Sequence, residues 1–314
     1  MANNLFLCRT PLQAFIISRI LKEEAVTDFD LLYVVGKKSD EDVNYYKMLS
    51  AESNVSYMLE KYKLRYSIVS TLASYISCPS HFKNNDYENV YLASIDSILF
   101  GLVLTNLQYE GLVTFDDGSA NIFPVSSYSM PKGPRRAGLY RRVLGVKTVD
   151  EMKSLSDKHY TIYRNFPNIV SEEKTDYIGG IDSNGHDDCL TESGPTFFIG
   201  QPFHQYLPAG AVNKLKAWMD AAGVDFYVQH PREESPIIDN VPILDKGGEI
   251  AEIAILEKCE GVKPTIIGGF SSVLLNIDES RARKIYLQIR GDKKEWNENA
   301  MSLMKQAGCD VVRI

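Results

Sequence analysis

The stretch LFLCRTPLQAFIISRIL, residues 5–21, joins a short apolar run to a longer helical pattern. Leu5 to Cys8 can form a buried strand, and Leu12 to Leu21 carry apolar residues at helical spacing. Thr10 as N-cap and Pro11 at the first helical position predict where the helix begins. A strand followed directly by a helix is the repeating unit of a parallel sheet that is covered by helices.

The same alternation continues along the chain. Further strands are predicted at 31–36, 89–94, 111–115, 196–200, 224–228, 265–269, 282–288 and 310–313, and further helices at 95–105, 207–222, 250–259 and 296–306. Gly223 predicts the end of the helix at 207–222. Between about residues 120 and 195 the periodicity is weak.

Strands that alternate with helices on both sides of an irregular middle predict an α/β protein of two Rossmann-like, doubly wound domains. We expect an N-terminal domain at 1–175, a linker at 176–194 and a C-terminal domain at 195–314. In such sheets ligands bind at the carboxyl ends of the strands. The two domains are therefore expected to face a central cleft, and polar residues just after strands are the candidate site.

The composition is typical of a globular protein, with 44% hydrophobic and 24% charged residues in 314. A net charge of -7 argues against a broad nucleic-acid-binding face. The five cysteines contain no CxxC pair, no signal peptide is evident, and no apolar run approaches about 20 residues. These features predict a cytoplasmic protein with reduced thiols, no zinc site and no spanning helix.

One segment is strongly basic within this acidic chain. It is either a solvated surface stretch or a site for an anionic glycan or lipid head group. Its basic residues are Lys132, Arg135, Arg136, Arg141, Arg142 and Lys147.

Asp116 and Asp117 follow the predicted strand at 111–115 and precede Gly118 and Ser119. Adjacent carboxylates repel each other, which can raise the pKa of one of them and create a usable general base. Gly118 allows a sharp turn of the backbone there. The alternative is a β-turn capped by the aspartates.

His230, Pro231 and Arg232 follow the strand at 224–228. A histidine at this position can donate a proton to a leaving phosphate, and Arg232 could pair with phosphate. The alternative is a surface histidine with no such role.

Gly268-Gly269-Phe270-Ser271-Ser272 links a strand to a helix. Free backbone N–H groups and serine hydroxyls favour an anion there, although serine N-capping alone would also explain the pattern. The segment lacks the GxGxxG and P-loop patterns. A base in the first half, an acid in the second and a phosphate site together predict glycosyl transfer. Since none of these strand-end motifs contains a DxD sequence, a bridging metal is not indicated.

Several of these motifs recur, in this order, in a known family. They are Tyr91-Leu92-Ala93-Ser94, Thr114-Phe115-Asp116-Asp117-Gly118, Asp157-Lys158-His159-Tyr160-Thr161-Ile162, His230-Pro231-Arg232 and Phe270-Ser271-Ser272. From Leu5 to about Asn276 the chain resembles the bacterial lipooligosaccharide sialyltransferases, glycosyltransferase family 52. The set is also similar, more distantly, to the motifs of other bacterial sialyltransferases and polysialyltransferases.

This resemblance implies a GT-B fold, CMP-N-acetylneuraminic acid as donor, inversion at the anomeric carbon, no metal requirement and a homodimer. It also implies that His230 assists the departure of CMP and that Ser271 and Ser272 contact its phosphate. Taken together with position and side-chain chemistry, it gives the expected donor-binding set Gly200, Gln201, Pro202, Pro231, Arg232, Glu252, Gly269, Phe270, Ser271 and Ser272.

The chain departs from the family in one respect. Members can carry a candidate carboxylate base within a Gly-x-Pro segment, but here Gly200-Gln201-Pro202-Phe203-His204-Gln205 contains no acid. Asp117 or Asp116 could serve as the base, and His204 is the other candidate. We favour the aspartate pair, with His204 otherwise a hydrogen-bonding residue of the cleft wall.

The remaining assignments follow from position. Cys8, Arg9, Thr10 and Gln13 end the first strand, where acceptor binding is expected, together with Gly118 and Ser119. Glu252 either holds the ribose hydroxyls or is a solvated helix residue. His159 is expected to be a packing position between the domains.

We therefore predict an inverting sialyltransferase that transfers N-acetylneuraminic acid to a terminal galactose on a bacterial surface glycan, lipooligosaccharide or capsule. Peripheral contact with the inner membrane would suit such an acceptor. Two alternatives stay open: a hexosyltransferase that uses a UDP-sugar, and a non-catalytic protein that binds nucleotide sugars or glycans.

Overall fold

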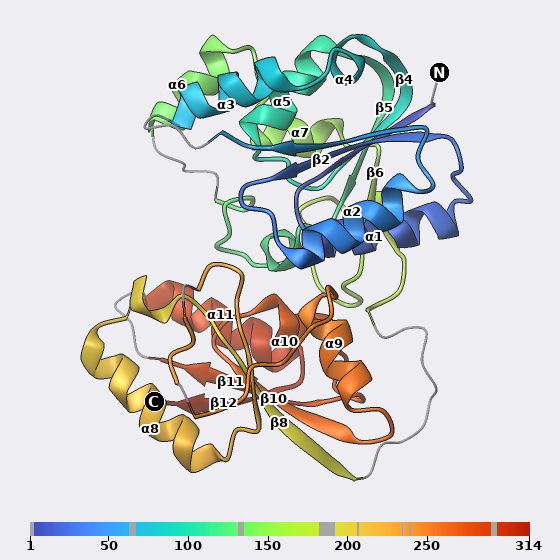
Figure 1. Cartoon of the computed structure of the whole chain (residues 1–314). Coiled ribbons are helices and arrows are strands. Elements are labelled where there is room, and N and C mark those ends of the chain that lie inside the picture. The colour runs from blue at the N-terminus through green and yellow to red at the C-terminus, as the bar shows by residue number, and fades with distance from the viewer. Residues whose placement is uncertain are drawn as a thin grey trace. The chain divides into compact units, whose positions relative to one another are not determined.

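The computed structural model describes residues 3–62, 67–130, 135–181, 192–205, 207–233, 235–238, 240–289 and 294–314. The chain divides into two compact units, Met1–Ile178 and Gly179–Ile314. Each unit is an α/β layer structure around a parallel sheet, as the sequence predicts (Figure 1).

The first unit contains a seven-stranded sheet in which all neighbours are parallel. In spatial order its strands are β3 (Val55–Glu60), β2 (Phe29–Val35), β1 (Asn4–Cys8), β4 (Asp86–Leu92), β5 (Gln108–Phe115), β6 (Lys158–Thr161) and β7 (Thr175–Tyr177). The strand order reverses between β1 and β4, which is the point where ligands bind in doubly wound sheets.

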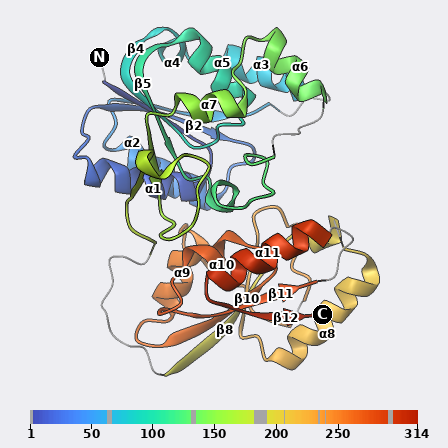
Figure 2. The same cartoon turned by 180° about the vertical axis from the view of Figure 1, so that it is seen from behind.

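Helices cover both faces of this sheet. On one face lie α1 (Pro11–Glu23) and α2 (Asp40–Ser50); on the other lie α3 (Ser67–Ser77), α4 (His81–Asn84), α5 (Ile98–Asn106), α6 (Arg135–Val143) and α7 (Val149–Leu155) (Figures 1 and 2). Right-handed crossovers require this division, because the chain reverses its direction across the sheet after β3. Two short 3₁₀ turns complete the unit, at Gly118–Asn121 and Glu172–Lys174.

The second unit contains a five-stranded parallel sheet. Its strands, in spatial order, are β12 (Cys309–Arg313), β11 (Arg283–Gln288), β10 (Lys263–Gly268), β8 (Ser193–Ile199) and β9 (Phe226–Val228). Its helices are α8 (Ala209–Ala222), α9 (Ala251–Lys258), α10 (Ser272–Asn276) and α11 (Lys294–Gln306), with a 3₁₀ turn at Phe203–Gln205. The strand order reverses between β8 and β10.

The predicted helix signals are confirmed. Thr10 accepts a hydrogen bond from the Gln13 backbone N–H at 3.2 Å, and Pro11 is the first residue of α1. Gly223 ends α8 in the left-handed conformation, with φ 64°.

The middle of the chain is more regular than its weak periodicity predicts. Residues 120–195 contain α6, α7, β6 and β7, so the expected irregular stretch is wrong for this part. The strands β6 and β7 have only four and three residues, too short for alternation to be recognised. Residues 176–177 belong to β7 and 193–194 to β8, while residues 182–191 of the expected linker lie outside the described part.

Alternate strand residues face different layers of the first unit. Leu5 and Leu7 pack toward Phe100 and Val103 of α5, whereas Phe6 stacks on Tyr91 with 4.2 Å between ring centroids. In the second unit, sheet residues pack against the apolar face of α8. This core includes Phe198, Tyr227, Ile267, Leu287, Val212, Leu215 and Met219.

Of the five cysteines, Cys8, Cys78, Cys259 and Cys309 are free and buried, and Cys189 lies outside the described residues. In the part of the chain that the structure describes, no helix is long and apolar enough to span a membrane.

Candidate active site

Asp117 lies at the point of strand reversal in the first unit. It leaves the end of β5 and accepts hydrogen bonds from Tyr128 OH at 2.5 Å, Ser94 Oγ at 3.2 Å and the Gln13 side-chain amide. Gln13 follows β1 and Ser94 follows β4, so the two strands that flank the reversal both supply donors. The carboxylate is thus held in a fixed orientation.

The surroundings of Asp117 suit a general base. Burial raises the pKa of its carboxyl, and the hydrogen bonds from Tyr128 and Gln13 oppose this rise only in part. A carboxylate with a raised pKa accepts a proton more readily than an ordinary aspartate does. The backbone N–H of Asp117 donates to Asn121 Oδ1 at 2.7 Å, which closes the turn after Gly118, a residue with φ 76°.

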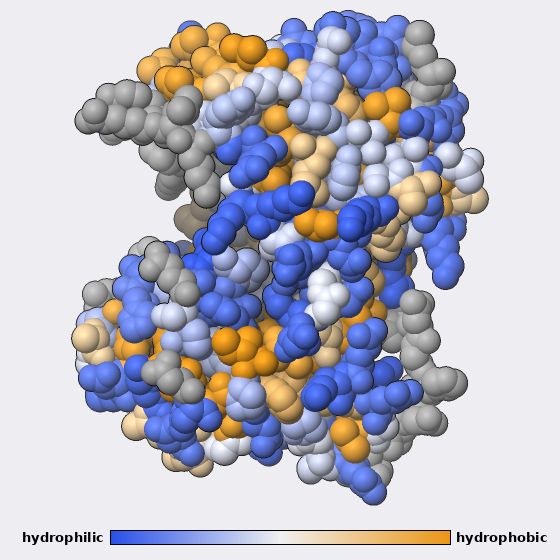
Figure 3. All heavy atoms as spheres, viewed as in Figure 1, coloured by the Kyte–Doolittle hydropathy of each residue, from blue (hydrophilic) through white to orange (hydrophobic). Residues whose placement is uncertain are grey.

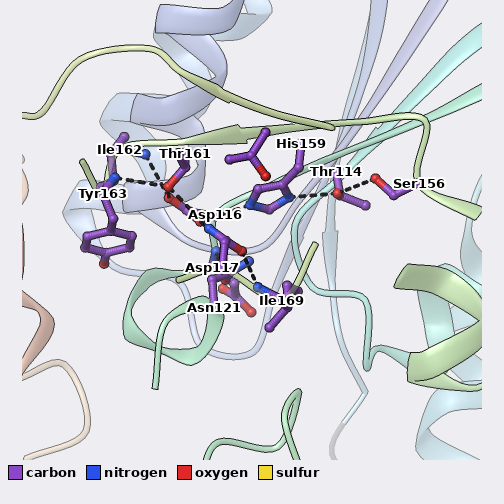
Figure 4. Close-up of polar contacts among 12 residues, drawn as sticks. Thr114, Asp116, Asp117, Asn121, Ser156, His159, Thr161, Ile162, Tyr163 and Ile169 are labelled. Atoms are coloured by element: carbon purple, nitrogen blue, oxygen red, sulfur yellow. Dashed lines mark hydrogen bonds and ion pairs between the residues drawn. The ribbon is translucent and has the colours of Figure 1, made fainter. Parts of the chain in front are cut away.

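Asp116, although adjacent in sequence, has a different environment. Its side chain is fully buried and accepts four hydrogen bonds (Figure 4). The donors are Thr161 Oγ1 at 2.7 Å, the Ile162 backbone N–H at 2.8 Å, His159 Nε2 at 3.1 Å and Asn168 Nδ2 at 3.1 Å. With both oxygens occupied and no exposed surface, Asp116 joins β5 to β6 and cannot reach a substrate. We therefore correct its assignment as a base candidate.

These contacts explain a motif that had no role at the sequence level. His159 and Thr161, from the segment that follows Asp157, both bind Asp116, and His159 also contacts Thr114 Oγ1 at 2.8 Å. His159 is 0% exposed and lies within the first unit, so the expected packing position between domains is wrong.

The residues predicted to bind an acceptor are only partly available. Gln13 is 0% exposed, and its amide is used by Asp117, by Ser94 at 3.0 Å and by the Arg9 backbone N–H at 2.7 Å. It positions Asp117 and has no free group for an acceptor. Thr10 is exposed, whereas Arg9 and Ser119 are half-buried near the same strand ends. The buried residues Cys8 and Gly118 shape the backbone.

In the second unit three loops leave the sheet side by side. Ile199 at the end of β8 pairs with Val228 of β9 and with Gly268 of β10. The sequence-predicted donor segments therefore begin at one edge of the sheet, on both sides of the strand reversal. Gln201 Nε2 donates to the Phe270 carbonyl at 2.7 Å and ties two of these loops together.

Glycines allow this close approach. A Cβ on Gly200 would lie 2.3 Å from Glu233 Oε2 and 2.7 Å from the Tyr227 ring, and a Cβ on Gly269 would lie 2.8 Å from Gln201 Oε1. The glycines of both segments are thus explained by packing. Pro202 is half-buried and Pro231 is exposed at the turns that follow.

His230 has a defined tautomer. Its Nδ1 accepts a hydrogen bond from the Arg232 backbone N–H at 3.0 Å, so in the neutral ring the proton is on Nε2. Burial lowers the pKa of His230 to about 4, with further lowering by the charges of Arg232 and Lys246. In the absence of an anion, this side chain is a neutral N–H donor at pH 7.

Glu233 was not singled out at the sequence level. It accepts the His230 backbone N–H at 2.8 Å and Tyr227 OH at 2.7 Å, and burial raises the pKa of its carboxyl. Glu233 therefore fixes the loop that carries His230. Glu233 lies three residues after His230 in the sequence, and this spacing is the signal that could have identified it.

Ser271 is the N-cap of α10, and its Oγ accepts the Val273 backbone N–H at 3.3 Å. Its own hydroxyl proton stays available for an anion. Ser271 and Ser272 are half-buried, and Phe270 packs edge-on against Trp296 with 5.2 Å between ring centroids. Because α10 has only five residues, its dipole adds little, and hydroxyl and backbone donors dominate this site.

Two further candidates differ from expectation. Glu252 is 5% exposed and accepts Asn276 Nδ2 at 2.6 Å, so a solvated helix position is wrong, and burial raises the pKa of its carboxyl. His204 is exposed in the 3₁₀ turn after Pro202. Asp117 is half-buried and oriented by three hydrogen-bond donors, whereas His204 is exposed, which makes the aspartate the better base.

The basic segment is also only partly a surface. Arg141 is 9% exposed, and its guanidinium donates to the carbonyls of Lys147 and Asp96, so its role is structural. Arg142 and Lys147 are exposed. Lys132 and the side chains of Arg135 and Arg136 lie outside the part of the chain that the structure describes. Among the residues that are described, no three His, Cys, Asp or Glu side chains cluster as a metal site would require.

Two parallel α/β units, with a half-buried carboxylate at one strand reversal and histidine and serine donors at the other, have the fold of the GT-B type. The model of Glycosyltransferase family 52 matches residues 31–289, and the chain belongs to this family. The resemblance inferred from the motifs is thereby confirmed.

Relatives agree with this classification. The chain is 27% identical over 279 residues to the N-acetyllactosaminide alpha-2,3-sialyltransferase of Haemophilus influenzae, covering 87% of this chain and 88% of the relative. It is 27% identical over 282 residues to the CMP-N-acetylneuraminate:beta-galactoside alpha-2,3-sialyltransferase of Pasteurella multocida, covering 87% of each. The solved alpha/beta-galactoside alpha-2,3-sialyltransferase of Photobacterium phosphoreum shares the fold, with a TM-score of 0.55, 12% identity and coverage of 99% and 97%.

Proposed function

We propose that this enzyme transfers N-acetylneuraminic acid from CMP-N-acetylneuraminic acid to a terminal galactose with inversion, forming an alpha-2,3 linkage. The observation that carries the proposal is the similarity, over 87% of the chain, to relatives named for that reaction. The presence of a half-buried carboxylate with a raised pKa and of a His–Ser–Ser donor set in the same chain supports it.

In the proposed reaction Asp117 removes the proton from the acceptor hydroxyl. The hydroxyl oxygen then bonds to the anomeric carbon of the sugar while the bond from that carbon to the phosphate oxygen breaks. The bonding electrons leave with CMP, and the proton stays on Asp117 until it is lost to solvent. A raised pKa brings the base closer to the working pH, which is where general base catalysis is most effective.

Neutral His230 donates its Nε2–H to the departing phosphate, and Ser271 and Ser272 donate their hydroxyls. Preorganised donors of this kind stabilise charge that develops in the transition state. We also propose that the transfer needs no metal, because a single phosphate can be neutralised by these donors. Activity that is unchanged after chelation would support this, and restoration by added Mg²⁺ would contradict it.

The finer expectations also remain proposals. We propose that the acceptor is a lipooligosaccharide or capsular glycan and that the enzyme acts in the cytoplasm as a homodimer. Four free, buried thiols are compatible with a reducing compartment. Light scattering of the purified protein tests the dimer.

The donor assignment is tested by thermal unfolding with CMP, CMP-N-acetylneuraminic acid, UDP and UDP-hexoses. A ligand present at 100 times its Kd stabilises the folded state by about 2.7 kcal/mol, which shifts Tm by several degrees. We expect shifts with the two cytidine compounds and none with the uridine compounds. The opposite pattern would favour a UDP-dependent hexosyltransferase. Donor binding without product on galactose-terminated acceptors would favour a non-catalytic binding protein.

Replacing His230 by alanine is expected to lower turnover by about 10²–10⁴-fold without unfolding the protein. His230→Gln is the matched variant, because its amide N–H can replace the Nε2–H as a neutral donor. We expect His230→Gln to retain more activity than His230→Ala, measured as product formed from CMP-N-acetylneuraminic acid. An equal loss of activity in both variants would instead indicate proton transfer from an imidazolium. Near-normal activity of His230→Ala would show that His230 has no role in the reaction.

A further inference from the structure

The helix α3 exposes two of its apolar side chains and buries three of its polar ones. Val69 is 46% exposed and Ile76 is 75% exposed. Because they are seven residues apart, the two side chains lie on the same face of the helix. The opposite face, which packs toward α5, carries Ser70, Thr71 and Ser74, each 5% exposed or less. A helix that only covers a core would have the reverse arrangement.

The helix α6 lies alongside α3 in both views of the fold and repeats this pattern (Figures 1 and 2). Leu139 is 57% and Val143 is 74% exposed, and their spacing of four residues places them on one face. Arg141 points inward and anchors the helix through the Asp96 and Lys147 carbonyls. Hydrophobic side chains consequently gather on the surface over α3 and α6 (Figure 3).

Charge is segregated in the same part of the sequence. Residues 61–85 and 118–149, which contain both helices, hold ten of the 34 Lys and Arg residues and none of the 41 Asp and Glu residues. Arg142 and Lys147 are exposed, and Lys83 donates to the carbonyls of Tyr75 and Ile76 at the end of α3. In an acidic protein, these two segments thus combine cations with exposed apolar side chains and contain no carboxylate of their own; the exposed Glu151 beside Lys147 lies just outside them.

We propose that this α3–α6 face, formed by Val69, Ile76, Leu139, Val143, Arg142 and Lys147, docks on an anionic lipid membrane. Short amphipathic helices with basic and aliphatic residues lie in the membrane interface, with apolar side chains below the head groups. Each Lys or Arg near an anionic surface strengthens the binding further. At 11 and nine residues, α3 and α6 are too short to span a bilayer and long enough to lie on it.

A second copy of the chain fits this face less well. In a two-fold dimer the same patch meets itself, so the cations of both copies would face each other with no carboxylate in either segment to pair with them. The lipid proposal concerns binding alone and requires neither the donor nor the acceptor of the proposed reaction.

The test is co-sedimentation of the full chain with vesicles of phosphatidylcholine, with and without phosphatidylglycerol. We expect binding only to the anionic vesicles, weakened by added salt, and about a tenfold or greater loss of partitioning in the double variant Ile76→Glu, Val143→Glu. Met48→Glu, which places the same charge at a 38% exposed position of α2, is the control and should bind as the wild type does.

Unchanged binding of the double variant, or equal binding to neutral vesicles, would overturn the proposal. A wild-type dimer that binds no vesicles and becomes monomeric in the double variant would also overturn it, in favour of a second copy. Thermal unfolding of each variant checks that it is folded. Failure of the sialyltransferase proposal would leave the vesicle result unaffected.

Discussion

Asp117→Asn is expected to lower turnover by about 10²–10⁴-fold and, at the same time, to raise Tm at neutral pH. The loss of turnover follows because asparagine cannot accept the proton of the acceptor hydroxyl. The geometry should persist, since the asparagine oxygen can still accept from Gln13 and its NH₂ group can donate to Ser94 and Tyr128, whose hydroxyl oxygens accept.

The gain in stability follows from the raised pKa of Asp117. A carboxyl whose pKa is higher in the folded than in the unfolded protein favours folding only while it is protonated. Its contribution is fully present below the unfolded pKa and is lost as the pH rises through the folded pKa. Above that folded pKa the folded protein holds a partly desolvated carboxylate that the asparagine variant avoids.

The measurement is Tm of both proteins from about pH 4 to pH 8. The difference in Tm should favour Asp117→Asn at neutral pH and shrink as the pH falls toward the ordinary range for aspartate. A variant less stable than the wild type at every pH would contradict the assignment of Asp117 as a base whose carboxylate is destabilised by partial burial. Near-normal turnover would pass the role of base to His204.

The sequence predicts most of the sheet but does not separate the two aspartates. Short apolar runs identify the central strands because those strands are buried on both faces. The adjacent carboxylates look alike in sequence, yet the Asp116 N–H still pairs with the Tyr160 carbonyl at 3.1 Å, whereas Asp117 has left the strand. Since successive strand residues point in opposite directions, one carboxylate enters the core and the other faces the loops.

Buried polar partners are the other part that the sequence leaves undetermined. Gln13 and Tyr128 act through hydrogen bonds to Asp117, from which they are separated by 104 and 11 positions in the sequence. Without the strand order, nothing connects the residue after β1 to the residue after β5. Glycine is more informative, because Gly200 and Gly269 mark close approaches that only a residue without Cβ allows.

Asp116→Asn provides the matched contrast to Asp117→Asn, since the same chemical change is made one residue earlier. All four partners of Asp116 act as donors, and they divide between its two oxygens: His159 and Asn168 at one, Thr161 and Ile162 at the other. An asparagine NH₂ group must therefore face donors on either side. The backbone N–H of Ile162 cannot accept a hydrogen bond. Asn168 could accept only by turning its amide, which would break the hydrogen bond of 2.7 Å that its Oδ1 accepts from the Ile169 backbone N–H.

Because Asp116 is 0% exposed, water cannot relieve this conflict. A buried unsatisfied donor costs about 1–3 kcal/mol, and more when a charged partner is lost. We expect about 3 kcal/mol of destabilisation, which lowers Tm by roughly 6–12 °C for a unit of this size. Calorimetry compares Tm of Asp116→Asn and Asp117→Asn with Tm of the wild type. If Asp116→Asn were as stable as the wild type, the four-donor arrangement around this carboxylate would be wrong. Since β6 is held partly through these contacts, loss of activity in Asp116→Asn should track unfolding and recover on cooling, whereas loss in Asp117→Asn should persist in a fully folded protein.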